Sequence, residues 1–68
     1  MRYSYRVEYG NFGFNERHWN CDGKFEALRV YERQKYAFRY VRILDNTGKT
    51  VASWINYAEG AEEVYELV

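Results

Sequence analysis

The chain has 68 residues, a net charge of zero and a pI of about 6.6, and we expect it to form one domain, residues 1–68. The near-neutral pI argues against the strongly basic class of nucleic-acid-binding domains. Cys21 is the only cysteine, which excludes an internal disulfide and favours a reducing, cytoplasmic setting. No apolar run approaches the roughly 20 residues that span a bilayer, so no membrane association is expected.

The composition is rich in aromatic residues, with eight Tyr, four Phe and two Trp. Large rings bury much area per residue, which helps a short chain to build a core without disulfides or metals. A domain of this size buries only roughly 60% of the surface that its unfolded chain exposes. Some of the rings must therefore lie on the surface, where aromatic side chains favour interfaces.

The charges are distributed unevenly along the chain. Residues 2–49 hold all ten bases and six of the acids, a net charge of +4. All charged residues after residue 49 are acids, which give this C-terminal part a net charge of −4: Glu59, Glu62, Glu63 and Glu66. The two parts are either ordinary solvated surfaces or surfaces that face different partners or each other.

The first third of the chain predicts a β-hairpin. Residues 2–9 alternate, with Tyr3, Tyr5, Val7 and Tyr9 on one face, which is the pattern of a half-buried strand. Residues 10–15 form a turn region with two glycines that can adopt positive φ. Residues 16–20 are expected to return as a second strand.

The middle of the chain predicts one helix from residue 23 to about residue 34. Asp22 is expected to act as its N-cap, because a carboxylate can accept hydrogen bonds from the first backbone N–H groups. The apolar stripe is expected to consist of Phe25, Leu28 and Tyr31, bordered by Ala27 and Val30. The outer side carries Arg29, Glu32 and Arg33.

Two further strands are predicted over residues 36–44 and 50–57. The first alternates imperfectly, so either both of its faces are covered or a bulge near Tyr40 shifts its register. Residues 45–49 form a hairpin turn with Gly48 in the left-handed position. In the second strand, Ala52 and Trp54 face away from the other apolar residues. Residues 58–68 are compatible with a short helix or a strand.

These elements predict an α+β fold of two layers, in the order β-β-α-β-β with a short C-terminal element. The strands are expected to form one antiparallel sheet with the helix on one face. The second face of that sheet is expected to carry the remaining aromatic rings.

No motif in the chain predicts catalysis or cofactor binding. His18 and Cys21 are a potential base and nucleophile, or half of a metal site. Their proximity in the sequence does not establish that geometry, and in a strand His18 and Trp19 would point to opposite faces. The glycines at positions 10 and 13 lack the third glycine and the lysine of phosphate-binding loops. We therefore expect a protein that is not an enzyme and holds no cofactor or metal.

Residues 29–42 interleave five bases with four aromatic residues, opposed only by Glu32. Arginines attract phosphate and rings stack on unpaired bases, so a small nucleic-acid-binding domain with an aromatic and arginine-rich sheet face is one hypothesis. The alternative is that the rings pack under the helix and the arginines are solvated or paired with the acidic tail. The acidic tail also admits a third hypothesis, in which it mimics a phosphate backbone and occupies a basic groove.

The order of elements resembles that of small phage-encoded proteins that inhibit host machinery, such as anti-CRISPR proteins. The resemblance covers the whole chain and consists of the tyrosine-rich first strand, the helix capped at Asp22 and the hairpin of residues 42–51. It implies a stoichiometric blocker that binds a host protein in the host cytoplasm without a cofactor.

Our leading interpretation is a non-enzymatic protein-binding module, an inhibitor of viral origin. Aromatic and arginine side chains dominate interface energetics, and the expected contact surface is Tyr36, Arg39, Tyr40, Arg42 and Trp54. A nucleic-acid partner for the same residues is the alternative. A homodimer formed through exposed edge strands is a further possibility.

Overall fold

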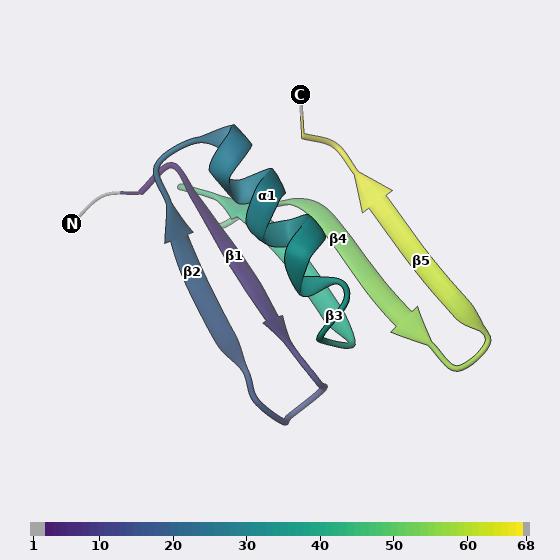
Figure 1. Ribbon diagram of the computed structural model, residues 1–68. Coiled ribbons are helices and arrows are strands. Elements are labelled where there is room, and N and C mark those ends of the chain that lie inside the picture. The colour runs from purple at the N-terminus through teal and green to yellow at the C-terminus, as the bar shows by residue number, and fades with distance from the viewer. Residues whose placement is uncertain (1–2, 68) are drawn as a thin grey trace.

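The computed structural model describes residues 3–67, which form one five-stranded antiparallel sheet with one helix on one of its faces (Figure 1). This confirms the predicted two-layer α+β fold, and the C-terminal element is a strand. The elements in chain order are β1 (Tyr5–Gly10), β2 (Arg17–Cys21), α1 (Lys24–Gln34), β3 (Tyr40–Asp45), β4 (Thr50–Tyr57) and β5 (Gly60–Tyr65).

The strand order in the sheet is β2-β1-β3-β4-β5, so β1 and β3 are the central pair although α1 and β2 separate them in the chain. The helix packs across β1, β2 and β3. None of residues 3–67 forms a helix of the length and apolarity that a bilayer crossing requires.

The core lies between α1 and the sheet, as the alternation of β1 predicts. Val7 of β1 is paired with Ile43 of β3, and Tyr9 is paired with Val41. Since directly paired residues share a face, these four side chains form one layer, and all four are buried. The other buried residues are Gly10, Cys21, Ala27, Tyr31, Ala52 and Leu67.

The helix buries a different stripe from the predicted one. Ala27 and Tyr31, one turn apart, are fully buried, whereas Phe25 is 77% exposed. Phe25 and Ala27 are two positions apart, which is about 200° of rotation around the helix axis. When Ala27 faces the sheet, Phe25 must therefore face solvent. The predicted place of Phe25 in the core is therefore wrong.

The predicted N-cap is also wrong, because the helix begins one residue later. Gly23 occupies the N-cap position with extended backbone, and no side chain caps the first turn. The first-turn residue Glu26 instead reaches back, and its Oε1 accepts a hydrogen bond from the backbone N–H of Asp22 at 3.2 Å.

Strand β3 begins at Tyr40, four residues later than predicted, and this resolves its imperfect alternation. Phe38 precedes the strand and packs its ring against that of Tyr9, with centroids 4.9 Å apart. From Tyr40 onward the alternation is regular until a register shift between Ile43 and Leu44. The bulge therefore lies at the far end of the strand, not near Tyr40.

The turn between β3 and β4 forms as predicted. Gly48 has a φ of 89°, and one carboxylate oxygen of Asp45 accepts hydrogen bonds from the backbone N–H groups of Thr47 and Lys49. Of the two glycines predicted in the first hairpin turn, only Gly13 has a positive φ, at 101°. Gly10 instead lies in β1, where an added Cβ would meet the Glu16 carboxylate at 2.7 Å.

Tyr31 connects the helix to the edge strand β5. Its hydroxyl donates a hydrogen bond to Glu63 Oε2 at 2.6 Å, and Lys35 Nζ donates to the same oxygen at 3.0 Å. These two donors hold the pKa of the Glu63 carboxyl below its usual range. Burial and the hydrogen bond to Glu63 raise the pKa of Tyr31. The acidic C-terminal segment is thus joined to the body of the domain and is not a frayed end.

One fully buried and one exposed apolar position, Ile43 and Phe25, provide a test of this core. We expect Ile43→Ala to lower the free energy of unfolding by about 2–5 kcal/mol, because it leaves a cavity between helix and sheet. Phe25→Ala is expected to change it by no more than about 0.5 kcal/mol, because the ring is solvated. Urea unfolding followed by far-UV circular dichroism measures both, and a large loss in Phe25→Ala would contradict the helix rotation described here.

Candidate interaction surface

The face of the sheet opposite α1 carries no second layer among residues 3–67 and is called the open face. The pairing of neighbouring strands places alternate residues of all five strands on it. They include Arg6, Glu8, His18, Asn20, Tyr40, Arg42, Leu44, Ser53, Ile55, Tyr57, Glu62 and Val64. The set mixes rings, aliphatic groups and charges of both signs.

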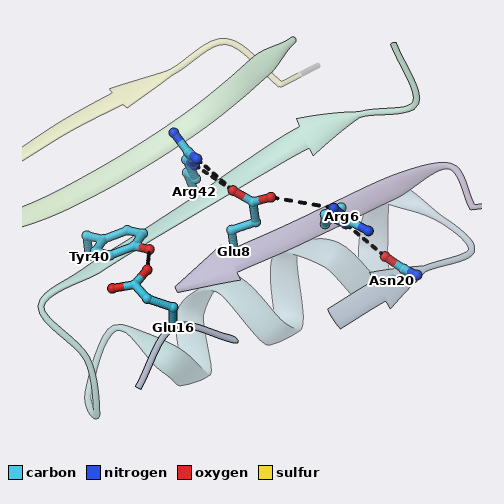
Figure 2. A network of polar contacts seen from close by, with 6 residues as sticks. All are labelled: Arg6, Glu8, Glu16, Asn20, Tyr40 and Arg42. Atoms are coloured by element: carbon cyan, nitrogen blue, oxygen red, sulfur yellow. Dashed lines mark hydrogen bonds and ion pairs between the residues drawn. The ribbon is translucent and has the colours of Figure 1, made fainter. Parts of the chain in front are cut away.

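A polar network runs across β2, β1 and β3 on this face (Figure 2). Arg42 donates to Glu8 Oε1 from both Nε, at 2.9 Å, and Nη2, at 2.7 Å. The other oxygen of Glu8 lies 3.7 Å from Arg6 Nη1, and Arg6 Nε donates to Asn20 Oδ1 at 3.2 Å. The network fixes long side chains in place, so part of their conformational entropy is lost before any partner binds.

Glu16 joins the first hairpin loop to Tyr40 of β3. The Tyr40 hydroxyl donates to one oxygen of Glu16 (Figure 2). The backbone N–H of Gly13 donates to the other oxygen at 2.8 Å. These two hydrogen bonds, in that order, hold the pKa of Glu16 below its usual range. Burial and the hydrogen bond to Glu16 raise the pKa of Tyr40 to about 12.

A shallow apolar hollow lies beside this network. It has a volume of about 420 Å³ and is lined by Phe12, Tyr40, Val41, Arg42, Thr50, Ser53 and Ile55. The rings of Phe12 and Tyr40 are tilted against each other with centroids 5.5 Å apart, and Phe12 is 54% exposed. A hollow of this kind, apolar inside and bordered by a fixed arginine, suits an apolar side chain of a binding partner.

The structure brings together some of the residues that the sequence predicts for the contact surface and separates others. Tyr40 and Arg42 lie next to the hollow, and the Arg39 guanidinium lies 6.0 Å from the centre of the Phe12 ring. Trp54 lies on the opposite face, where its ring is 5.9 Å from Lys35 Nζ. Tyr36 lies in the turn after α1 and is 92% exposed.

Several residues of this surface are absent from the predicted set, most clearly Glu8, Phe12 and Ile55. Glu8 alternates with the buried residues Val7 and Tyr9 in β1, so this alternation was a usable signal for its face. Phe12 lies in the loop between β1 and β2 with a φ of 55°. No strand alternation in the sequence predicts where its ring lies.

The basic stretch of residues 29–42 does not form one patch. Arg29 and Arg33 lie on α1, and Lys35 is paired with Glu32 and Glu63. Arg42 lies on the other face of the sheet, paired with Glu8. The interleaving of rings and arginines in the sequence is therefore divided between the two layers of the fold.

His18 and Cys21 are not brought together. They differ by three positions in β2, so they lie on opposite faces, and Cys21 is fully buried. Burial, followed by the negative charges of Glu26 and Asp22, raises the pKa of the Cys21 thiol to about 11. Such a thiol is not activated as a nucleophile. Among residues 3–67 no three His, Cys, Asp or Glu side chains are arranged to hold a metal ion.

Comparison with known proteins gives no relationship, because no family model, curated protein or solved structure matches the chain.

The hydrogen bond between Tyr40 and Glu16 predicts a specific titration behaviour. We expect Tyr40→Phe to raise the pKa of Glu16 towards its ordinary value, but not fully, because the Gly13 N–H still donates to the carboxylate. Since the folded-state pKa is depressed, this group stabilises the fold above its ordinary pKa, and that contribution is lost as the pH falls through the folded-state value. The variant should therefore lose less stability on acidification than the wild type.

Carboxyl-carbon NMR titration gives the pKa of Glu16, and thermal melts between about pH 5 and pH 2 give the stability. Glu59→Gln, at an exposed turn position, is the control. An unchanged pKa of Glu16 in Tyr40→Phe would contradict the hydrogen bond.

Proposed function

We propose that the chain is a non-enzymatic protein-binding module that contacts its partner through the open face of the sheet. The observation that carries this proposal is the apolar hollow between Phe12, Tyr40 and Ile55, adjacent to a fixed network of opposite charges. Binding hot spots combine an apolar anchor site with aromatic and arginine side chains at the centre of an interface. The hollow and Arg42 supply both.

The charge distribution favours a protein partner over a nucleic acid. Glu8 lies between Arg6 and Arg42 on the open face, and Glu16 lies beside Tyr40. A phosphate backbone on this face would approach two carboxylates, which is unfavourable, and would have to compete with Glu8 for the arginines. A protein surface can instead offer apolar groups to the hollow and polar groups to the network.

The rest of the interpretation from the sequence stays part of this proposal. The module would act as a stoichiometric blocker in the cytoplasm, as the resemblance to phage-encoded inhibitors implies. It would need no cofactor, because binding alone would exclude the natural ligand of its target.

An affinity pull-down from a bacterial lysate, with and without nuclease, tests the proposal. We expect a protein to remain bound in stoichiometric amount after nuclease treatment. Ile55→Lys and Arg42→Glu should each weaken its capture by on the order of tenfold or more, because one places a charge in the hollow and the other breaks the pair with Glu8.

Arg29→Glu is the matched control, because it reverses the same charge at an exposed position on α1. It should capture the partner as the wild type does, and circular dichroism should show all three variants to be folded. Equal capture by Ile55→Lys, Arg42→Glu and the wild type would overturn the assignment of the open face. Partners that disappear with nuclease would instead establish nucleic acid as the ligand.

A further inference from the structure

The sheet has two outer edges that differ in charge. Strand β2 forms one edge and β5 the other, and neither pairs with a further strand among residues 3–67. Counting the antiparallel pairings from β2 through β1, β3 and β4 shows that both edge strands run in the same direction, as Figure 1 also shows. Unpaired edges are templates for the addition of another strand.

The β5 edge is acidic and protected against pairing with itself. Glu62 and Glu63 lie in the middle of the strand, and Glu59 and Glu66 flank it. In an antiparallel pair of two β5 strands centred on this segment, carboxylates of the two copies would lie opposite each other, which is destabilising. All six residues of β5 are nevertheless exposed.

The β2 edge carries one base, Arg17, between the flanking acids Glu16 and Asp22, and lies beside Arg29 and Arg33 of α1. Arg17 and Trp19 share the helix-side face of the strand, and Trp19 is 51% exposed. A hollow of about 460 Å³ between β2 and α1 is lined by Trp19, Glu26, Arg29, Val30, Arg33 and Gln34. No carboxylate within residues 3–67 forms an ion pair with Arg17, Arg29 or Arg33. Glu26 is engaged, because it accepts a hydrogen bond from Trp19 Nε1 at 3.3 Å.

We propose that the β5 edge of one copy of this chain adds to the β2 edge of a second copy, so that copies associate head to tail. Because both strands run in the same direction, the pairing is parallel and keeps the helices of both copies on the same side. The register that aligns residues 61–65 with residues 17–21 places Glu62 beside His18 on the open face. It places Glu63 next to Arg17 and Trp19 on the helix side.

Charge complementarity selects this pairing over the alternatives. Parallel ladders are slightly less stable per residue than antiparallel ones, so the acidic strand and the arginines near the other edge must supply part of the free energy. The same charges disfavour two β5 edges meeting. A nucleic acid could also meet Trp19 and the arginines, but it would not use the backbone groups of the edge strand, and Glu26 lies in the hollow.

The proposed contact is heterologous, because it uses two different surfaces of each copy. It does not close on itself, so it produces a series of oligomers whose size rises with concentration. Of the open face it uses only the edge residues His18 and Glu62, and neither the hollow nor Arg42. The association therefore goes beyond the proposed function and does not depend on it.

Sedimentation velocity tests the proposal on the full chain. At low ionic strength, about 0.01 M, the weight-average mass should rise from that of one chain, 8.3 kDa, through successive multiples as the concentration approaches about 1 mM. At about 0.5 M salt the mass should fall back, because the ion pairs are screened. Lys49→Gln, which removes a base from the turn between β3 and β4 and not from β2, α1 or β5, should associate as the wild type does.

Two complementary double variants distinguish a head-to-tail contact from any symmetric one. Arg17→Gln with Arg33→Gln alters only β2 and the neighbouring side of α1, and Glu62→Gln with Glu63→Gln alters only β5. Each variant alone should remain monomeric. An equimolar mixture should form a complex that stops at two chains, because only one intact β5 and one intact β2 edge are present.

Three outcomes would overturn the proposal. The first is a wild type that stays at the mass of one chain at about 1 mM and low salt. The second is a variant that forms dimers alone, which would indicate a symmetric contact. The third is a mixture that shows no heterodimer, or a wild-type mass that rises only when a single-stranded oligonucleotide is added.

Discussion

The structure depends on one constraint: a single helix of eleven residues must cover a sheet of five strands. The helix meets this constraint by packing Ala27 and Tyr31 against β1, β2 and β3, and leaves β4 and β5 to be held by strand pairing. The hydrogen bond from Tyr31 to Glu63 then attaches the outer hairpin to the helix. The exposure of the Tyr57 ring follows from the same constraint, because no second layer among residues 3–67 covers the open face.

The fold was predictable because it depends on local patterns. The alternation of β1 and β4, the glycine turn at position 48 and the helical composition after residue 23 each act over a few residues, and each formed. The errors also have a local cause. A stripe drawn from Phe25 to Tyr31 satisfies helical spacing, but the rotation of the helix is set by the small residue Ala27, which permits close approach to the sheet. Only the packed structure decides between the two stripes.

The candidate surface was less predictable because its contacts join distant parts of the chain. Tyr40 and Arg42 were found from their residue type, whereas Glu8, which fixes Arg42, lies 34 positions away. Trp54 was assigned to the same surface although its alternation with Ile55 places it on the opposite face. Residue chemistry therefore identified individual side chains, and the order of the strands determined which of them share a face.

The order of strands also has a consequence for the rate of folding. The pairs β1–β2, β3–β4 and β4–β5 are hairpins of neighbouring strands, whereas the ladder from Gly10–Tyr40 to Tyr5–Asp45 joins residues about 30–40 positions apart. Closing that loop costs chain entropy before the contacts compensate for it. The loop contains α1, whose Tyr31 and Ala27 pack on both strands of this ladder. The transition state for folding should therefore have the helix docked and β1 meeting β3, while the acidic outer strand is added afterwards.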